Sequence, residues 1–243
     1  MENIISLTMK SQCSKGSLTA KSGLKAEQIF RTDLNIKNIL EKYFDKKIRS
    51  VSKIQGEKYD TLILFDDNSE IKIQNKKIEN LGGRGNSFDR RHIKDTFNNQ
   101  FIRKYLTVLS LIRKGKNETM LNVEQKKDFI NLCNRNIEDI KQYLMKNLIG
   151  IDNKKNDYFC ILKTNNRFSK IELYIINSSK FYEFLEKSIN IDISLKKNGT
   201  CLHLSPHISL QRKGGGKTDK SPNHIQAKLK FTQEILNLFD KIL

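Results

Sequence analysis

The residue types at the ends of two neighbouring apolar runs suit phosphodiester hydrolysis with a divalent cation. Asp60 precedes the run over residues 61–65, and Gln74 and Lys76 end the run that follows a polar turn at residues 66–69. A carboxylate and an amide carbonyl supply the oxygen ligands that a hard divalent cation prefers. A lysine ammonium can orient the attacking water or stabilise charge that develops on a phosphate. We therefore expect Asp60 and Gln74 to bind Mg²⁺ and Lys76 to act beside them.

The elements that position these residues are predicted to be the two strands of a hairpin. Two β-prone runs separated by a cluster of Asp, Asn and Ser are typical of this motif. With a loop at residues 66–70, Asp60 lies opposite Lys76 and diagonal to Gln74, all on one face. A register shift of one residue would move Asp60 to the other face. An ordinary solvated hairpin with a charged rim is the alternative.

A rival pair with the same spacing, Glu70 and Lys72, lies too far from Asp60. Glu70 stands beside the turn, at the far end of the strand that Asp60 begins. The intervening strand covers about 16 Å at the usual rise per residue. One metal ion cannot bridge that distance, so Gln74 and Lys76 are the better partners of Asp60.

A helix before the hairpin brings a further acidic residue into consideration. The spacing of apolar residues predicts a helix over residues 24–44, and Glu27 lies near its start. A lone Glu in a first turn is commonly no more than a favourable charge for the helix dipole. The alternative is that its carboxylate leans toward the metal site, and we include Glu27 among the candidate catalytic residues.

The charge of the whole chain favours a polyanionic partner. The chain has 243 residues and a formal net charge of +18, so its surface should attract nucleic acid. An anionic membrane is the competing partner, but no apolar run is long enough to span one, and the lysines are dispersed instead of lining one amphipathic helix. The four cysteines are scattered singly, which fits reduced thiols in a cytoplasm.

The alternation of helical and β-prone segments predicts an α/β fold with a central mixed sheet flanked by helices. After the hairpin, helices are expected over residues 88–111 and 123–148. Beyond residue 150 the pattern changes to short strands around one further helix. We therefore place a catalytic core with a helical extension at residues 1–150 and a β-rich, basic recognition lobe at residues 151–243.

A glycine-rich basic segment, residues 81–92, follows Lys76 closely. Its glycines permit close approach of the backbone to a ligand, and we predict a loop that contacts DNA. A flexible connector into a helix is the alternative. The residues expected to hold phosphates or probe the duplex are Arg84, Asn86, Ser87, Phe88, Arg90 and Arg91.

The C-terminal part contains a second basic segment. A strand expected at residues 207–211 runs into a glycine-rich basic loop, and a closing strand at residues 225–231 alternates apolar residues inward with Gln and Lys outward. Amides can address base edges while cations hold phosphates, and Arg212 is the best candidate for a guanine contact. The candidate DNA-binding residues here are Gln211, Arg212, Lys213, Lys217, Gln226 and Lys228.

The order of these motifs resembles the small type II restriction endonucleases of the PD-(D/E)xK superfamily, in particular the monomeric enzymes that cut GCGC and CCGG. The GCGC-cutting enzymes are similar in using a Gln-x-Lys half-motif. The resemblance implies that Asp60, Gln74 and Lys76 are catalytic, that Mg²⁺ is required, and that the two glycine-rich segments read bases. The matching segments are residues 19–27, 56–60, 74–76, 84–85 and 208–215.

The chain also departs from these enzymes. Tyr59 stands where they carry a small residue, the spacing from Asp60 to Gln74 is shorter, and residues 98–155 match poorly. The target sequence therefore cannot be transferred. We expect a cytoplasmic type II restriction endonuclease that cuts duplex DNA at a short palindrome, as a monomer or dimer, with a cognate DNA methyltransferase in the same cell. The alternatives are a structure-selective repair or resolvase nuclease and a non-catalytic nucleic-acid-binding protein.

Overall fold

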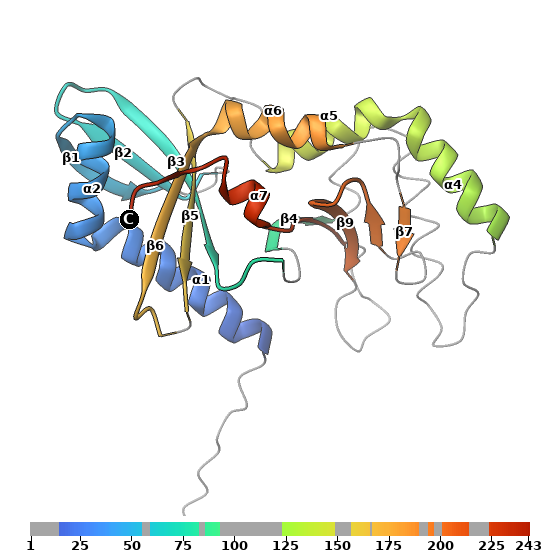
Figure 1. Ribbon diagram of the computed structural model, residues 1–243, viewed down its shortest axis with the longest axis horizontal. Coiled ribbons are helices and arrows are strands. Elements are labelled where there is room, and N and C mark those ends of the chain that lie inside the picture. The colour runs from blue at the N-terminus through green and yellow to red at the C-terminus, as the bar shows by residue number, and fades with distance from the viewer. Residues whose placement is uncertain are drawn as a thin grey trace, which may run out of the picture.

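The computed structural model shows two β-sheets with helices packed around them (Figure 1). The helices are α1 (Lys15–Thr32), α2 (Leu34–Phe44), α4 (Val123–Arg135), α5 (Ile137–Leu148), α6 (Ser178–Ser188) and α7 (Gln233–Leu236). The structure describes residues 15–54, 59–82, 86–92, 123–148, 157–165, 167–189, 194–196, 201–213 and 224–243.

The central sheet has six strands and is mixed. β3 and β5 run parallel, and the other neighbouring strands run antiparallel. The expected α/β fold with a central mixed sheet flanked by helices is confirmed. In spatial order the strands are β1 (Ile48–Lys53), β2 (Thr61–Phe65), β3 (Glu70–Ile78), β5 (Tyr158–Thr164), β6 (Ile171–Asn177) and β11 (Asp240–Lys241).

The second sheet has five antiparallel strands and includes a segment that we expected to be a loop and the start of a helix. Residues 86–92 instead form an edge strand beside the closing strand of the C-terminal region. Pairing with that neighbouring strand outweighs the loop-forming composition around it, as tertiary context commonly does in sheets. In spatial order the strands are β4 (Asn86–His92), β10 (His224–Leu229), β9 (Ile208–Lys213), β8 (Cys201–His203) and β7 (Ser194–Lys196).

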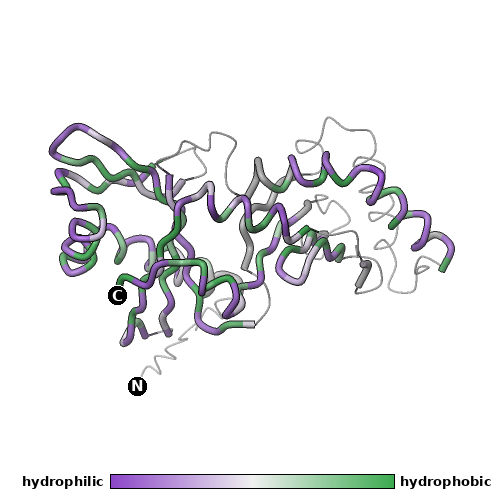
Figure 2. The backbone as a smooth tube through the Cα atoms, turned by 45° about the horizontal axis from the view of Figure 1, so that its top comes forward, coloured by the Kyte–Doolittle hydropathy of each residue, from purple (hydrophilic) through white to green (hydrophobic). Residues whose placement is uncertain are grey.

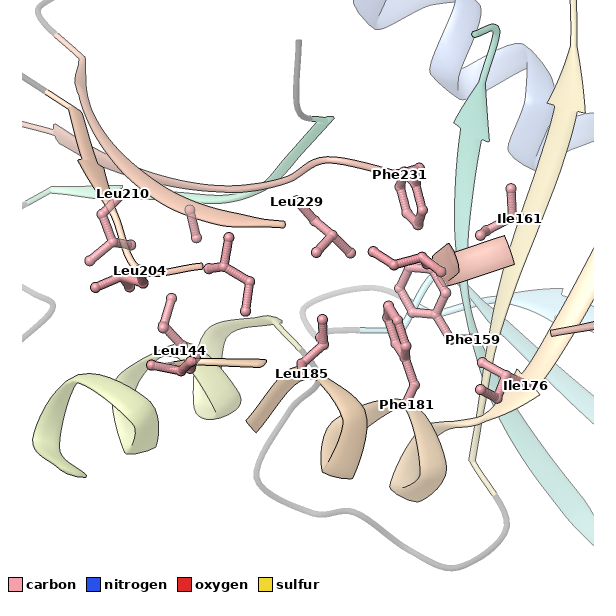
Figure 3. Close-up of a cluster of buried hydrophobic side chains, with 14 of the residues drawn as sticks. Leu144, Phe159, Ile161, Ile176, Phe181, Leu185, Leu204, Leu210, Leu229 and Phe231 are labelled. Carbon is pink, nitrogen blue, oxygen red and sulfur yellow. The ribbon is translucent and has the colours of Figure 1, made fainter. Parts of the chain in front are cut away.

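The predicted change of character at residue 150 does not separate the two sheets. β5, β6 and β11 lie after this residue but belong to the central sheet, whereas β4 lies before it and belongs to the second sheet. A single buried cluster contacts both sheets, from Phe159 on β5 through Phe181 on α6 to Leu229 on β10 (Figure 3). The expected division into two domains stays a prediction.

The two faces of the central sheet are covered by different helices. Buried side chains of α1 and α2, among them Phe30 and Leu40, pack against Ile63 and Ile73 on one face. The other face packs against α5, α6 and the second sheet. Each fully buried Leu, Ile or Phe contributes about 1.5–3 kcal/mol to folding, so the face against α1 and α2 holds the hairpin firmly in the sheet.

Helices α1 and α2 are separated at Asp33, where a polar residue interrupts the apolar repeat. The single helix expected over residues 24–44 is two helices, because the Asp33 carboxylate accepts hydrogen bonds from the backbone N–H groups of Asn35 (2.8 Å) and Ile36 (3.2 Å) and caps α2. Hydrophilic and hydrophobic segments alternate along the chain (Figure 2).

Within the described residues, no helix has both the length and the apolar character needed to cross a membrane.

Candidate active site

The turn between β2 and β3 sets the register of the hairpin. Asn68 adopts a φ of 65°, a left-handed conformation that Asn tolerates better than most residues. The N–H of Phe65 donates to the carbonyl of Ser69 at 2.9 Å, and Leu64 pairs with Glu70. The turn is therefore tighter than the expected loop over residues 66–70.

This tighter turn corrects the predicted pairing of Asp60. Thr61 pairs with Ile73, and the N–H of Asp60 donates to the carbonyl of Ile73 at 3.0 Å. Asp60 therefore lies beside Ile73, and the prediction that it lies opposite Lys76 was wrong. On β3, Gln74 and Lys76 share one face, while Asn75 shares the other with Ile73, which packs with residues of α1. All of them lie at one end of the hairpin, and a face shared by Asp60, Gln74 and Lys76 stays a prediction.

The residue between Gln74 and Lys76 fixes the Asp60 carboxylate. The backbone N–H of Asn75 donates to Oδ2 of Asp60 at 2.9 Å, and its side-chain Nδ2 donates to Oγ1 of Thr61 at 2.8 Å. Thr61, Gln74 and Asn75 are all buried. The place of Asn75 inside the Gln-Asn-Lys segment was a signal in the sequence that it could serve this role.

Glu27 reaches the same site from α1. It lies in the middle of this helix, because α1 begins at Lys15, so the expected first-turn position was wrong. Burial raises the pKa of the Glu27 carboxyl, and the nearby Asp60 raises it further. Three cations lower the same pKa, namely Lys76, Arg31 and Lys53. Side chains from α1, β1, the start of β2 and β3 therefore converge on one charged cluster.

Two of these cations were not found from the sequence. Arg31 lies one turn after Glu27, and its Nη1 is 3.9 Å from Oε2 of Glu27. Lys53 is exposed on β1 and pairs with Thr61, the residue after Asp60. The helical spacing of Arg31 was a usable signal. The position of Lys53 depends on the pairing of β1 with β2, which no local pattern reports.

The donor set at this cluster fits a hard divalent cation. Two carboxylates and an amide oxygen are the ligand types that Mg²⁺ accepts. The influence of Asp60 on the pKa of Glu27 shows like charges held close together, which a cation between them would relieve. Within the described parts of the chain, no group of three or more His, Cys, Asp or Glu side chains could hold a metal ion. An amide oxygen would therefore have to complete the set, from Gln74 as predicted or from Asn75, whose Oδ1 is buried without a hydrogen-bond partner among the described residues.

The second sheet presents a row of polar residues in register. Gln226 on β10 pairs with Gln211 on β9 and with Arg90 on β4, and Gln211 pairs in turn with Cys201 on β8. Strand alternation sets this row opposite the buried leucines of the same sheet. Gln226 lies on the face opposite Ala227 and Leu229 but is only 9% exposed. The Oε1 atom of Gln211 is buried and accepts no hydrogen bond from the residues that the structure describes.

A neighbouring row contains Lys228, which pairs with Ser209 on β9. Arg212 does not belong to the Gln row, because its backbone pairs with that of Ile225. Arg84 and Lys217 lie outside the described residues. The structure describes the strand backbone of the other predicted DNA-binding residues, and their roles stay predictions; these are Asn86, Ser87, Phe88, Arg90, Arg91 and Lys213.

The connection after β3 ties the candidate active site to the second sheet. Gly82 adopts a φ of 70°, which glycine accepts without strain. Its N–H donates to the carbonyl of Phe231 at 2.8 Å, directly after β10. The chain that leaves Lys76 is therefore anchored beside the strand that carries Gln226 and Lys228.

Comparisons with known proteins add a structural similarity. No protein-family model matches the chain, and no curated protein matches it in sequence. The fold aligns with the crystal structure of the restriction endonuclease MspI in complex with its cognate DNA, over 88% of this chain and 80% of that chain, with 13% sequence identity and a TM-score of 0.46. A similarity at this level carries no argument about activity, so the function is argued from the arrangement of residues.

Proposed function

We propose that the protein is a Mg²⁺-dependent endonuclease that hydrolyses phosphodiester bonds in duplex DNA. The observation that carries this proposal is the convergence of Asp60, Glu27 and Lys76 at the end of the hairpin where the Asn75 N–H holds the Asp60 carboxylate. These residues come from separate elements and share one charged site. An ordinary hairpin with a solvated charged rim would not require a half-buried acid from α1 beside it.

The residues divide into metal ligands and a phosphate-binding cation. Asp60, Gln74 and Glu27 would hold Mg²⁺, which when bound supplies Lewis-acid activation of water and phosphate. The hydrogen bond from the Asn75 N–H keeps the Asp60 carboxylate in place. Lys76 places a positive charge where negative charge on the phosphate develops. Lys53 extends this positive charge toward solvent, where a polyanion would arrive.

The polar row of the second sheet would read the DNA sequence. Primary amides offer both a donor and an acceptor to base edges, and Gln211 and Gln226 are paired in register on neighbouring strands. Lys228 and Arg90 would hold the flanking phosphates. We propose sequence-specific cutting at a short palindrome, as in a type II restriction endonuclease, with a cognate DNA methyltransferase protecting the same sites in the cell.

A non-catalytic DNA-binding protein is the second candidate. The observation that favours it is that the described residues contain no cluster of three acidic or other strong metal ligands. Both candidates would use the basic surface to bind DNA, but only the nuclease requires Asp60 and Lys76.

Substitution of the catalytic pair separates the two candidates. Asp60→Ala and Lys76→Ala should each reduce Mg²⁺-dependent cleavage by about 100-fold or more, while binding to a DNA duplex in Ca²⁺ persists. Asp66→Ala and Lys72→Ala, at the turn end of the same strands, are the matched controls and should cleave normally. Cleavage by Asp60→Ala at the wild-type rate would refute the catalytic assignment.

A further inference from the structure

The turn that joins β5 to β6 contains a strained aromatic residue. Phe168 adopts a φ of 58°, a left-handed conformation that costs a residue with a side chain roughly 1–2 kcal/mol. Asn165 maintains it: its Oδ1 accepts hydrogen bonds from the N–H groups of Arg167 and Ser169, both at 3.1 Å. Strain that the surrounding structure maintains in this way is a pointer to function.

Two ammonium groups lie over the Phe168 ring. Nζ of Lys25 is 4.9 Å from the ring centroid, and Nζ of Lys77 is 5.2 Å from it. Lys25 precedes Glu27 by two residues on α1, and Lys77 follows Lys76 on β3. The elements that build the candidate active site therefore also place cations against this turn.

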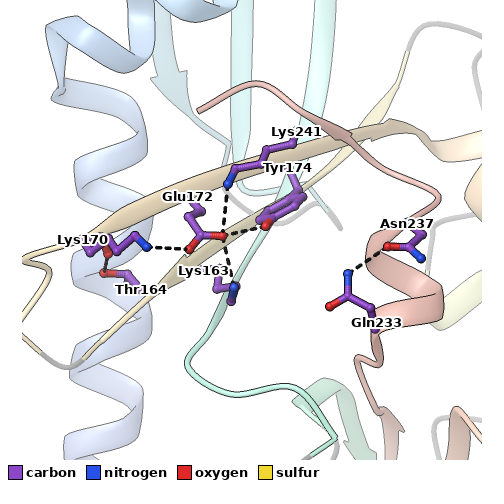
Figure 4. Close-up of polar contacts among 8 residues, drawn as sticks. All are labelled: Lys163, Thr164, Lys170, Glu172, Tyr174, Gln233, Asn237 and Lys241. Atoms are coloured by element: carbon purple, nitrogen blue, oxygen red, sulfur yellow. Dashed lines mark hydrogen bonds and ion pairs between the residues drawn. The ribbon is translucent and has the colours of Figure 1, made fainter.

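A further group of cations lies on the strands beside the turn. Glu172 on β6 accepts a hydrogen bond from the Tyr174 hydroxyl at 2.7 Å (Figure 4). Its carboxylate oxygens also pair with Lys163 at 3.1 Å and with Lys170 and Lys241 at 3.5 Å each. One carboxylate cannot compensate three ammonium groups, so positive charge is left over next to the turn.

Lys25 and Arg167 add charge that the described carboxylates do not neutralise. Both side chains are exposed, and neither forms an ion pair with an acidic residue in the described part of the chain. Lys170 is also largely exposed, at 81% of its side chain. Lys25, Arg167 and Lys170 around Phe168 are called the turn surface below.

We propose that the turn surface binds the phosphate backbone of duplex DNA beside the candidate active site. The inference rests on the proposed function, because it assigns the surface to the same substrate. Membrane-binding cations typically line one amphipathic helix. Here they lie on a hydrogen-bonded turn and on a helix that contacts it through Lys25 and the Phe168 ring, an arrangement that presents a cluster of cations to a polyanion.

The salt dependence of DNA binding tests this proposal. The triple variant Lys25→Gln, Arg167→Gln, Lys170→Gln is measured against a short synthetic duplex in Ca²⁺, between about 50 and 200 mM salt. Each lost phosphate contact should reduce the slope of log K against log salt by about 0.9, so the triple variant should lose about 2.7. The matched control removes three exposed lysines on the α2 and α6 surfaces: Lys42→Gln, Lys180→Gln and Lys187→Gln.

A charge-conserving triple variant, Lys25→Arg, Arg167→Lys, Lys170→Arg, should keep the wild-type slope and shows that the turn still folds. A slope in the Gln triple variant equal to that of the control would overturn the proposal. If the wild type never cleaves DNA but the slope falls as expected, the turn surface stands and the nuclease function fails. If the wild type cleaves DNA and the slope does not fall, the nuclease function stands and the proposal for the turn surface fails.

Discussion

Single residues decide whether the hairpin is a metal site or an ordinary piece of sheet. Gln74 and Lys76 could be placed on one face of β3 from sequence, because strand alternation keeps residues two apart on one face, whereas their catalytic role with Asp60 stays a prediction. Lys53 could not be named, because its neighbours come from the pairing of β1 with β2. Asn75 lay between predicted residues, and only the hydrogen bonds to Asp60 and Thr61 reveal its positioning role.

Gln74 provides the sharpest residue-scale prediction. Gln74→Glu keeps an oxygen ligand but adds a charge at a buried position next to Asn75, whose N–H holds the Asp60 carboxylate. Without a cation the variant should be less stable than wild type, because a third carboxylate is buried there. Mg²⁺ should restore the stability, by about 2.7 kcal/mol at a hundredfold excess over Kd. Thermal unfolding with and without Mg²⁺ measures this.

Gln74→Leu is the matched control, since it fills similar space without an oxygen ligand. It should gain no stability from Mg²⁺ and should not cleave DNA. An equal Mg²⁺-dependent gain in both variants would remove Gln74 from the metal site.

At the scale of elements, the hairpin of β2 and β3 was predicted, and the pairing between distant strands was not. The spacing of apolar residues placed β2 at its observed bounds and ended β3 two residues early. The spacing did not show that residues 86–92, which we expected to be a loop and the start of a helix, would form β4 and pair with β10. Pairing between distant segments produces no periodic pattern in either segment. The spacing also merged α1 and α2, because the Asp33 cap interrupts an otherwise continuous apolar repeat.

Glu172 gives an element-scale prediction about pH. Hydrogen bonds from Tyr174 and Lys163, with further help from nearby ammonium charge, lower the pKa of Glu172 from its ordinary value of 4.5 to about 2. A carboxyl whose folded pKa is depressed contributes stability above its unfolded pKa and loses it as pH falls. The contribution of Glu172 should therefore be present above pH 4.5 and disappear toward pH 2.

The comparison is made between wild type and Glu172→Gln by thermal unfolding across that range. The variant should be less stable than wild type near neutral pH, and the difference should shrink as the pH falls through the window. The exposed Glu183→Gln on α6 is the control and should show no such pattern. A difference that stays constant down to pH 2 would contradict the account of Glu172.

At the scale of the whole molecule, the net charge and the positions of the cations both favour a polyanionic partner. The net charge of +18 gave the first indication of a polyanion, but composition alone cannot say where that charge lies. The structure gathers part of it at the candidate active site and at the turn surface, with the polar row on the adjoining sheet. The buried cluster that joins both sheets holds these features in one body of packed side chains.

The measurement that tests this account most directly is digestion of unmodified plasmid DNA by the purified protein, with Mg²⁺ or with EDTA, followed by sequencing of the cut ends. The account predicts discrete fragments in Mg²⁺, ends that map to one short palindrome, and no cutting in EDTA. Intact plasmid in Mg²⁺, despite binding of the protein to the DNA, would contradict the central claim that the cluster around Asp60 hydrolyses phosphodiesters.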